Sequence, residues 1–197
     1  MYLEWALVAG LALGAYLLGS FPTAYIVVRR TKRQDIRELG SHNVGAMNAF
    51  QQAGAWPVTL VLLTDAGKGA IAVLAPLWLG FSPWTVFLTS GFAVIGHVWP
   101  VFLNFSGGKG AAVVLGVSLT FLPLLTLTAA VPTALIIFLT RNVVIGAVLG
   151  FAILNTLVIA TGQGPAQMAV CLLMTVLVST TYVVSLRKQL STAIKHR

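Results

Sequence analysis

The sequence is poor in acidic residues and has a single cysteine. Only 8% of its residues are charged, whereas soluble domains have roughly 25%. The acids are Glu4, Asp35, Glu38 and Asp65, too few to favour a two-carboxylate hydrolase or a carboxylate-rich metal cage. Cys171 stands alone, so an internal disulfide is excluded, and we expect it to be a small core or lipid-facing residue.

Common catalytic motifs are also absent. The chain has no Gly-x-Ser-x-Gly, His-Glu-x-x-His or Cys-x-x-Cys. Neither His42 nor His97 has an aspartate five positions later, which excludes the His-x4-Asp pattern of acyl-CoA- or acyl-carrier-dependent glycerolipid acyltransferases. With no evident nucleophile–base pair, catalysis would depend on positioning and electrostatic stabilisation of an already activated substrate. We expect neither a metal nor a cofactor.

Apolar stretches dominate what remains, since 58% of the residues are hydrophobic. Runs of about 20 apolar residues recur, which predicts an all-α polytopic membrane protein. The first run lacks a basic region before it and leads into further apolar runs, so we expect a helix there and not a signal peptide. No internal repeat or linker is evident, so we expect residues 1–197 to form one integral membrane domain.

The apolar runs predict the membrane spans. The stretch 111–140 carries no charge, and it is long for one span and short for two. A break near Pro123 would give two short helices and about seven spans in all, whereas one long helix would give six. Apart from 111–140, we expect spans at 2–28, 56–79, 84–104, 143–161 and 166–186, and a long polar segment at 29–54.

The net charge of +8 follows the loops between spans. With seven spans, every basic residue except Lys68 falls on one side of the membrane, which the positive-inside rule identifies as cytoplasmic. The N-terminus is then outside and the C-terminus cytoplasmic, and we expect a multi-pass protein of the bacterial inner membrane. The scattered basic residues lack an aromatic-rich soluble module, so nucleic-acid binding is not expected.

The polar segment contains the first candidate site. Hydroxyl and amide groups beside flexible glycines suit phosphate oxygens or a polyol. The alternative is a solvated loop with a helix cap, in which the first two charges form an interfacial pair. The candidate residues are Asp35, Arg37, Gly40, Ser41, Asn43, Gly45 and Asn48.

An acid and a base interrupt the second apolar run. Asp65 and Lys68 are three residues apart, so they lie on the same face of a helix. Charges inside a span normally face the bundle interior or a watery cavity. They could form a self-neutralising pair that helps helices pack, or Lys68 could contribute positive charge to an anion site with Asp65 orienting it. The flanking Gly67 and Gly69 permit close helix approach.

A glycine-rich turn around Lys109 is the third candidate. Gly107, Gly108 and Gly110 let the backbone approach a ligand and point N–H groups at an anion. Lys109 does not fit a Walker motif but could bind a phosphate as a point charge. His97 could be a packed, hydrogen-bonded residue or a base or orienting donor.

Together these segments resemble the bacterial membrane acyl-phosphate:glycerol-3-phosphate acyltransferase family. The family has seven spans with conserved loops on the cytoplasmic face, which agrees with the charge pattern. The matching motifs keep the family's order and spacing. They are Leu18-Gly19-Ser20-x-Pro22, Asp35-x-Arg37-x-x-Gly40-Ser41-x-Asn43-x-Gly45-x-x-Asn48, Asp65-x-x-Lys68-Gly69, Gly96-His97-x-x-Pro100-x-Phe102-x-x-Phe105-x-Gly107-Gly108-Lys109-Gly110 and Thr140-Arg141.

The resemblance implies transfer of a fatty acyl group from acyl phosphate to the 1-hydroxyl of sn-glycerol 3-phosphate, giving lysophosphatidate and phosphate. Membrane lipids would surround the enzyme; the sequence does not give its oligomeric state. The resemblance implies that Ser41, His97 and Lys109 are catalytic. The expected binding residues are Arg37, Gly40, Asn43, Gly45, Asn48, Asp65, Lys68, Gly107, Gly108 and Gly110.

The chain departs from the family pattern at two places. Gln51 stands where the family has an arginine implicated in phosphate binding, and the tail at 182–190 lacks the family's His-Arg-x-Asn motif. One alternative is therefore an impaired or acceptor-altered paralogue that binds lipid-phosphate ligands, in which Arg187 or Lys188 replaces lost charge. A small anion channel or transporter is a further alternative, although an odd span count without two evident halves disfavours an inverted-repeat transporter.

Overall fold

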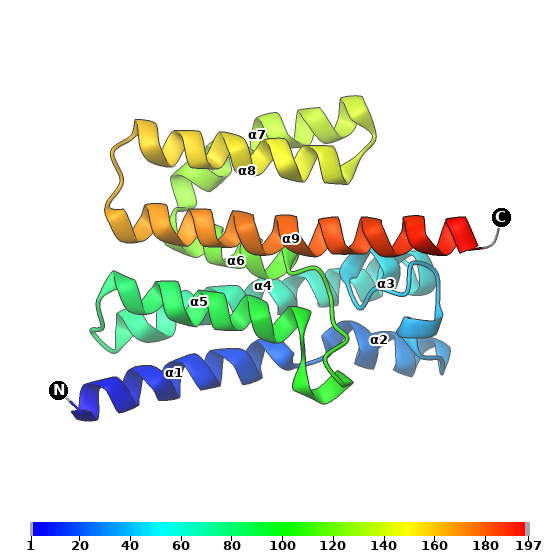
Figure 1. The fold of residues 1–197 in the computed structure, drawn as a ribbon, viewed down its shortest axis with the longest axis horizontal. Helices are drawn as coiled ribbons and strands as arrows, with labels where there is room; N and C mark the ends of the chain where they lie inside the picture. The colour runs from blue at the N-terminus through cyan, green and yellow to red at the C-terminus, as the bar shows by residue number, and fades with distance from the viewer. Residues whose placement is uncertain (1, 196–197) are drawn as a thin grey trace.

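The computed structural model describes residues 2–195, with side chains to residue 187, and this part of the chain contains no strand. The long helices run side by side along one axis (Figure 1). The elements are α1 (Tyr2–Ser20), α2 (Thr23–Lys32), η1 (Ile36–Glu38), α3 (Ala46–Ala53), α4 (Ala55–Trp78), α5 (Pro83–Val98), η2 (Val101–Leu103), α6 (Ala111–Phe121), α7 (Pro123–Thr140), α8 (Val143–Ala160) and α9 (Pro165–Lys195).

The all-α membrane architecture is confirmed. Six helical segments between residues 2 and 187 are long and apolar enough to cross a membrane, and α6 is a shorter apolar helix of 11 residues. The predicted break near Pro123 is also present, because α6 ends at Phe121 and α7 begins at Pro123. Proline has no backbone N–H and favours the first turn of a helix. Of the two short helices expected in 111–140, only α6 is shorter than a span, because α7 has 18 residues.

The expected span at 2–28 is present within one candidate membrane span, Tyr2–Lys32, but it consists of two helices. α1 ends at Ser20 and α2 starts at Thr23, with Phe21 and Pro22 between them. The ring of Pro22 clashes with a helical conformation of the preceding residue, so the chain breaks there. The expected polar segment at 29–54 accordingly contains the end of α2, then η1 and α3.

Glycines let four helices touch backbone to backbone. A Cβ at Gly19 or Gly96 would collide with a main-chain carbonyl, Ala93 O or Tyr16 O respectively, across the α1–α5 contact. Gly69 and Gly116 lie equally close to backbone across the α4–α6 contact. Close glycine contacts of this kind stabilise membrane helix pairs through van der Waals packing. They bring α1, α4, α5 and α6 into one compact group.

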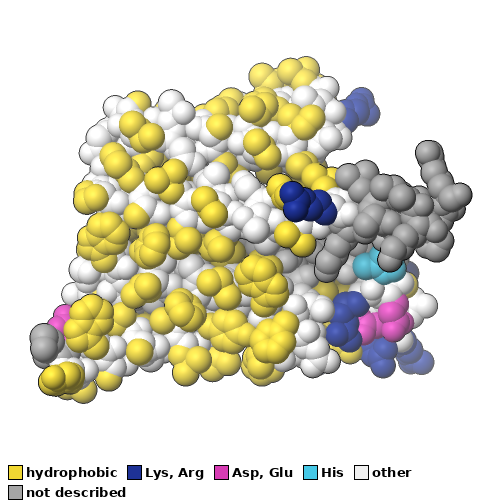
Figure 2. All heavy atoms as spheres, viewed as in Figure 1, with side chains coloured by type: hydrophobic (Ala, Val, Ile, Leu, Met, Phe, Trp, Pro, Cys, Tyr) yellow, Lys and Arg dark blue, Asp and Glu magenta, His cyan; other side chains and the backbone are white. Residues whose placement is uncertain are grey.

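Charged side chains gather at one end of this group. Figure 2 shows Lys and Arg together with Asp, Glu and His at the end where α2 and α3 lie, while the side of the bundle is largely hydrophobic. The exposed basic residues near this end include Arg29, Arg30 and Arg33. We call it the polar end.

We predict that Gly19→Ala destabilises the protein by about 1–3 kcal/mol, because the added methyl overpacks the α1–α5 contact. Gly14→Ala is the matched control on the same helix, since a Cβ there meets nothing within 4 Å. Replacing a helical glycine by alanine normally stabilises a helix by up to about 1 kcal/mol. Reversible unfolding in mixed micelles measures both variants, and equal effects would show that α1 and α5 do not pack through Gly19.

Candidate functional site

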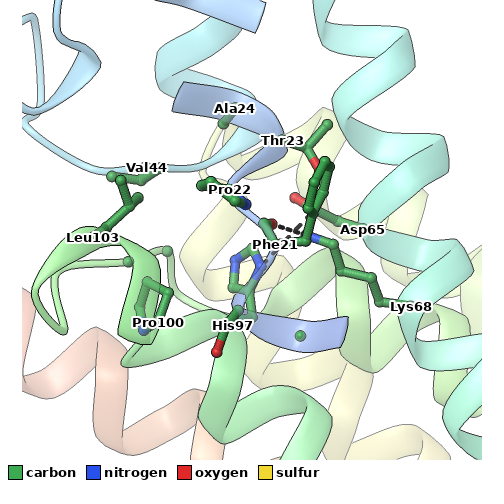
Figure 3. A pocket seen from close by; sticks show the side chains of 14 residues that line it. Phe21, Pro22, Thr23, Ala24, Val44, Asp65, Lys68, His97, Pro100 and Leu103 are labelled. Carbon is green, nitrogen blue, oxygen red and sulfur yellow. Dashed lines mark hydrogen bonds and ion pairs between the residues drawn. The ribbon is translucent and has the colours of Figure 1, made fainter. Parts of the chain in front are cut away.

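A polar pocket lies where α1 breaks from α2, at the polar end of the bundle (Figure 3). α4, α5 and the turn before α6 complete its walls. Its central space is about 10 Å³, roughly the volume that one water molecule needs. The lining residues are Gly19, Ser20, Phe21, Pro22, Thr23, Ala24, Val44, Asp65, Lys68, His97, Pro100, Leu103, Gly107 and Gly108.

A buried ion pair forms one wall of the pocket. Lys68 Nζ lies 2.6 Å from Asp65 Oδ1, and the two side chains are 2% and 3% exposed. The same ammonium donates a hydrogen bond of 2.6 Å to Phe21 O at the break between α1 and α2. An ammonium has three donors, and two of them bind these protein acceptors. The pair therefore holds the helix break against α4 and retains one donor.

His97 extends this wall from α5. Its Nδ1 lies 3.8 Å from Asp65 Oδ1, beyond hydrogen-bonding distance. The imidazole is buried, with 8% of the residue exposed, and it points into the pocket beside Phe21 (Figure 3). The structure thus brings His97 from one candidate segment next to Asp65 and Lys68 from another.

Two buried hydroxyls at the helix break have no partner. Ser20 Oγ and Thr23 Oγ1 both lie on residues that line the pocket, and neither forms a hydrogen bond to the described part of the protein. Burying an unsatisfied polar group costs about 1–3 kcal/mol, so such groups usually mark a water or ligand site. Neither residue is among the site residues that the sequence predicts, although Ser20 belongs to one of the matching motifs. The signal in the sequence is a hydroxyl residue on each side of Pro22.

The glycine turn does not form the expected N–H cradle. Gly107 N–H donates to Val98 O and Gly108 N–H to His97 O, each at 3.1 Å, so neither is free for an anion. A Cβ on Gly108 would collide with His97 Nε2. These glycines instead let the turn lie directly against His97. Gly110, the residue before α6, has a φ of +83°, a conformation that favours glycine.

Lys109 does not line the pocket. Its Nζ lies 4.6 Å from the ring centroid of Tyr182 on α9, and its carbonyl accepts a hydrogen bond of 3.0 Å from Thr181 Oγ1. Both contacts fasten the turn to α9, the first by a cation–π interaction. Partial burial lowers the pKa of Lys109 from its usual value, because it disfavours the charged form.

Asn48 organises the loop between α2 and α3. The side chain is buried, accepts a hydrogen bond from Ser41 N–H at 3.3 Å, and donates to Ile36 O, Leu39 O and Asn43 O. Its amide is thus occupied by the loop itself and is not directed at the pocket.

Two glycines of this loop lie so close to asparagine side chains that a Cβ would not fit. Gly40 has a φ of +54°, and a Cβ there would collide with Asn48 Oδ1. Gly45 precedes α3 in an extended conformation, and a Cβ there would lie 2.6 Å from Asn43 Nδ2. Ser41 is exposed. Among the loop residues, Val44 is the one that lines the pocket.

Arg37 anchors the loop to its surroundings. Its guanidinium contacts Asp35 at 2.6 Å and stacks over Tyr25 of α2 at 5.6 Å from the ring centroid. A longer contact of 3.5 Å reaches Leu103 O. The hydrogen-bonded guanidinium lowers the pKa of Asp35. The interfacial pair considered from the sequence is therefore present.

The positions that depart from the family pattern lie apart from the pocket. Gln51 is exposed on α3, and Arg187 is exposed on α9. The Lys188 side chain lies outside the described residues.

Among the described residues, no group of three or more His, Cys, Asp or Glu could hold a metal ion. The pocket can offer the hydroxyls of Ser20 and Thr23 and the remaining donor of Lys68, whose charge is paired with Asp65.

We predict that Asp65→Asn lowers the free energy of unfolding by about 3–5 kcal/mol, because it leaves Lys68 buried without its counter-charge. The double variant Asp65→Asn/Lys68→Met should lose at least ~1 kcal/mol less than the sum of the single variants. Denaturant unfolding in micelles gives the coupling. The half-exposed pair of Asp35 and Arg37 is the control, with an expected coupling below about 1 kcal/mol, and strictly additive losses at Asp65 and Lys68 would contradict the pairing.

Comparison with known proteins agrees with these features. The family described as "Glycerol-3-phosphate acyltransferase" matches residues 9–194. "Glycerol-3-phosphate acyltransferase" of Halalkalibacterium halodurans is 40% identical over 162 residues, which cover 81% of this chain and 76% of that protein. "Glycerol-3-phosphate acyltransferase 2" of Dehalococcoides mccartyi is 44% identical over 111 residues, and the chain spans about half of its length, 53%.

A solved structure shares the fold. It is the crystal structure of PlsY (YgiH), an integral membrane glycerol 3-phosphate acyltransferase, in its glycerol 3-phosphate form. The TM-score is 0.84 at 27% identity, covering 94% of this chain and 92% of that one. The lysophosphatidic acid form of PlsY matches with a TM-score of 0.80. The chain therefore belongs to the glycerol-3-phosphate acyltransferase family.

Proposed function

We propose that this protein transfers a fatty acyl group from acyl phosphate to the 1-hydroxyl of sn-glycerol 3-phosphate, an entry step of phospholipid synthesis. One observation carries the proposal. Motifs from α1, α4, α5 and the turn at 107–110 converge on a pocket with two unpartnered hydroxyls and a buried ammonium, in a chain that belongs to this family.

The proposed reaction needs no enzyme nucleophile. Acyl phosphate is a mixed anhydride, so the 1-hydroxyl oxygen attacks the acyl carbonyl carbon and the bond to the phosphate oxygen breaks. The proton of the hydroxyl passes to the departing phosphate, and the products are lysophosphatidate and inorganic phosphate. The work of the protein is then to position two anions and stabilise their charge. Ser20, Thr23 and the remaining donor of Lys68 suit phosphate oxygens.

Substrate entry requires the pocket to open. Its central space of about 10 Å³ is far smaller than the roughly 300 Å³ of a small-ligand site. The walls at the polar end are the loop that carries Ser41 and the turn that carries Lys109. We infer that these two segments move apart for the phosphates, so that Ser41 and Lys109 contact substrate in the open state. The glycines at 40, 45, 107 and 108 have no side chains, so the two segments can pack closely before they move apart.

We also propose that the polar end faces the cytoplasm. The basic residues gather there, and cytoplasmic loops carry the excess of Lys and Arg in bacterial membrane proteins. The water-soluble acceptor, glycerol 3-phosphate, would then enter the pocket directly from the cytoplasm, while the acyl donor enters from the lipid.

We predict that Lys109→Ala and Ser41→Ala each lower turnover at least ~10-fold, the loss expected when a contact to a charged substrate is removed. Cys171→Ala should stay close to the wild type, because Cys171 is buried on α9 among apolar residues. Phosphate release and lysophosphatidate formation by the purified protein measure all three. Equal effects in the three variants would refute the site, and binding of acyl phosphate without any product would favour the impaired paralogue.

A second prediction concerns the acceptor. Gln51 is exposed on α3, so Gln51→Arg should fold normally and restore the charge that the family carries there. We expect a lower KM for glycerol 3-phosphate, by a few fold to about tenfold for one exposed charge contact, with kcat unchanged. Gln52→Arg, on the neighbouring position of α3, is the control. A higher KM, or the same change in both variants, would show that position 51 does not face the acceptor.

A further inference from the structure

One aromatic ring of α9 lies against the glycine turn at 107–110. The Lys109 ammonium lies 4.6 Å from the centroid of the Tyr182 ring, within the roughly 6 Å at which a cation–π interaction is effective. Tyr182 begins the tail that lacks the family's His-Arg-x-Asn motif. In the described part of α9, a ring is therefore the group that meets the Lys109 side chain.

The core of the bundle fixes the position of this ring. Tyr182 is partly buried and packs against the core cluster that α5, α6 and α9 share, which includes Val94, Val113 and Val178. A tyrosine side chain has two χ angles, and packing on one side of the ring restricts both. The ring thus gives Lys109 a preorganised surface, of the kind that supports a functional side chain.

The ring holds the ammonium without occupying its donors. An ammonium has three donors, and Lys109 Nζ forms no ion pair within 4 Å and no hydrogen bond among the side chains described to residue 187. Lys68 differs, because two of its donors bind Asp65 and Phe21 O. The donors of Lys109 that point away from the ring are therefore available for phosphate oxygens.

The held ammonium belongs to the residue next to the pocket wall. Gly108 lines the polar pocket and lies against His97, and Lys109 follows it directly. A lysine ammonium stands on a flexible four-carbon stem, and ordering such a side chain costs conformational entropy. Contact with the Tyr182 ring restricts the stem before any substrate arrives.

We propose that Tyr182 is a positioning residue whose ring holds the Lys109 ammonium beside the pocket, where it meets a phosphate group of the substrate. This inference rests on the proposed function and names the part of α9 that serves the site. Lys109 contacts the substrate, and Tyr182 acts through Lys109. Partial burial lowers the pKa of Lys109, whereas the face of a ring favours the charged ammonium, so the same contact also helps to keep Lys109 charged.

A second contact from α9 reaches the backbone of the turn. Thr181 Oγ1 lies 3.0 Å from Lys109 O, but its single proton is shared with Val178 O at 2.7 Å. This contact does not involve the ammonium. Thr181→Val, which removes the hydroxyl and keeps the shape, is therefore a matched control at the neighbouring position.

The test is steady-state kinetics of the purified protein with acyl phosphate and glycerol 3-phosphate. Tyr182→Leu removes the ring and should lower kcat/KM about three- to tenfold, through the same parameter, kcat or KM, that Lys109→Ala changes. Tyr182→Phe keeps the ring and should stay within about twofold of the wild type. The double variant Lys109→Ala/Tyr182→Leu should match Lys109→Ala alone, because the ring then has no ammonium to position.

Three further variants separate positioning from packing. Leu177→Ala removes a side chain of α9 that packs on the same core cluster, and both it and Thr181→Val should stay within about twofold of the wild type in kcat/KM. Thermal unfolding checks that each variant is folded, and Tyr182→Met repeats the test if the leucine variant unfolds. A loss in either control as large as that in Tyr182→Leu, or single losses that multiply in the double variant, would overturn the inference.

The outcomes also separate this inference from the proposed function. An active wild type with unchanged kinetics in Tyr182→Leu overturns the inference and leaves the function standing. A wild type inactive on acyl phosphate refutes the function, and calorimetric binding of a fatty acyl phosphonate and of glycerol 3-phosphate in micelles then decides about Tyr182. Weaker binding of either ligand in Tyr182→Leu but not in Tyr182→Phe supports the inference. Equal binding in all three proteins, or no binding to the wild type, overturns it.

Discussion

The buried pair of Asp65 and Lys68 is the interaction on which the site depends. Removing two charges from water is costly, and close pairing offsets that cost. Lys68 also binds Phe21 O at 2.6 Å, where Pro22 interrupts the first helix. One side chain thus fixes the position of the helix break relative to α4. The break also places Ser20 and Thr23, with their unpartnered hydroxyls, beside this pair in the pocket.

Backbone contacts at glycines place the remaining walls around this pair. Gly19 and Gly96 bring α1 against α5, and Gly69 brings α6 against α4. The turn at 107–108 lies on His97 because Gly108 has no side chain. Glycine therefore permits both the close packing of the helices and the close packing of the turn on His97 at the polar end. Gly10 and Gly14 of α1 differ, because a Cβ at either position would meet nothing within 4 Å.

Much of the fold follows from local sequence. Apolar runs and prolines predicted the spans and the break at Pro123, because hydropathy and missing N–H groups act locally. By the same logic Pro22 predicts a break within the first span, whereas the apolar residues on both sides of it favour one helix. The site was harder to derive. The partners of Gly107 N–H and Lys109 Nζ are Val98 O and the Tyr182 ring, and no local pattern shows that these groups are already occupied.

The small volume of the polar pocket is consistent with acyl transfer from an activated donor. Water competes with the acceptor hydroxyl for a mixed anhydride, and a closed site excludes it. Asn48 keeps the loop of Ser41 ordered from within, while Arg37 ties the loop to Tyr25 and Leu103. A small pocket that opens by movement of its polar-end segments can therefore admit the substrates and still keep water from the activated donor.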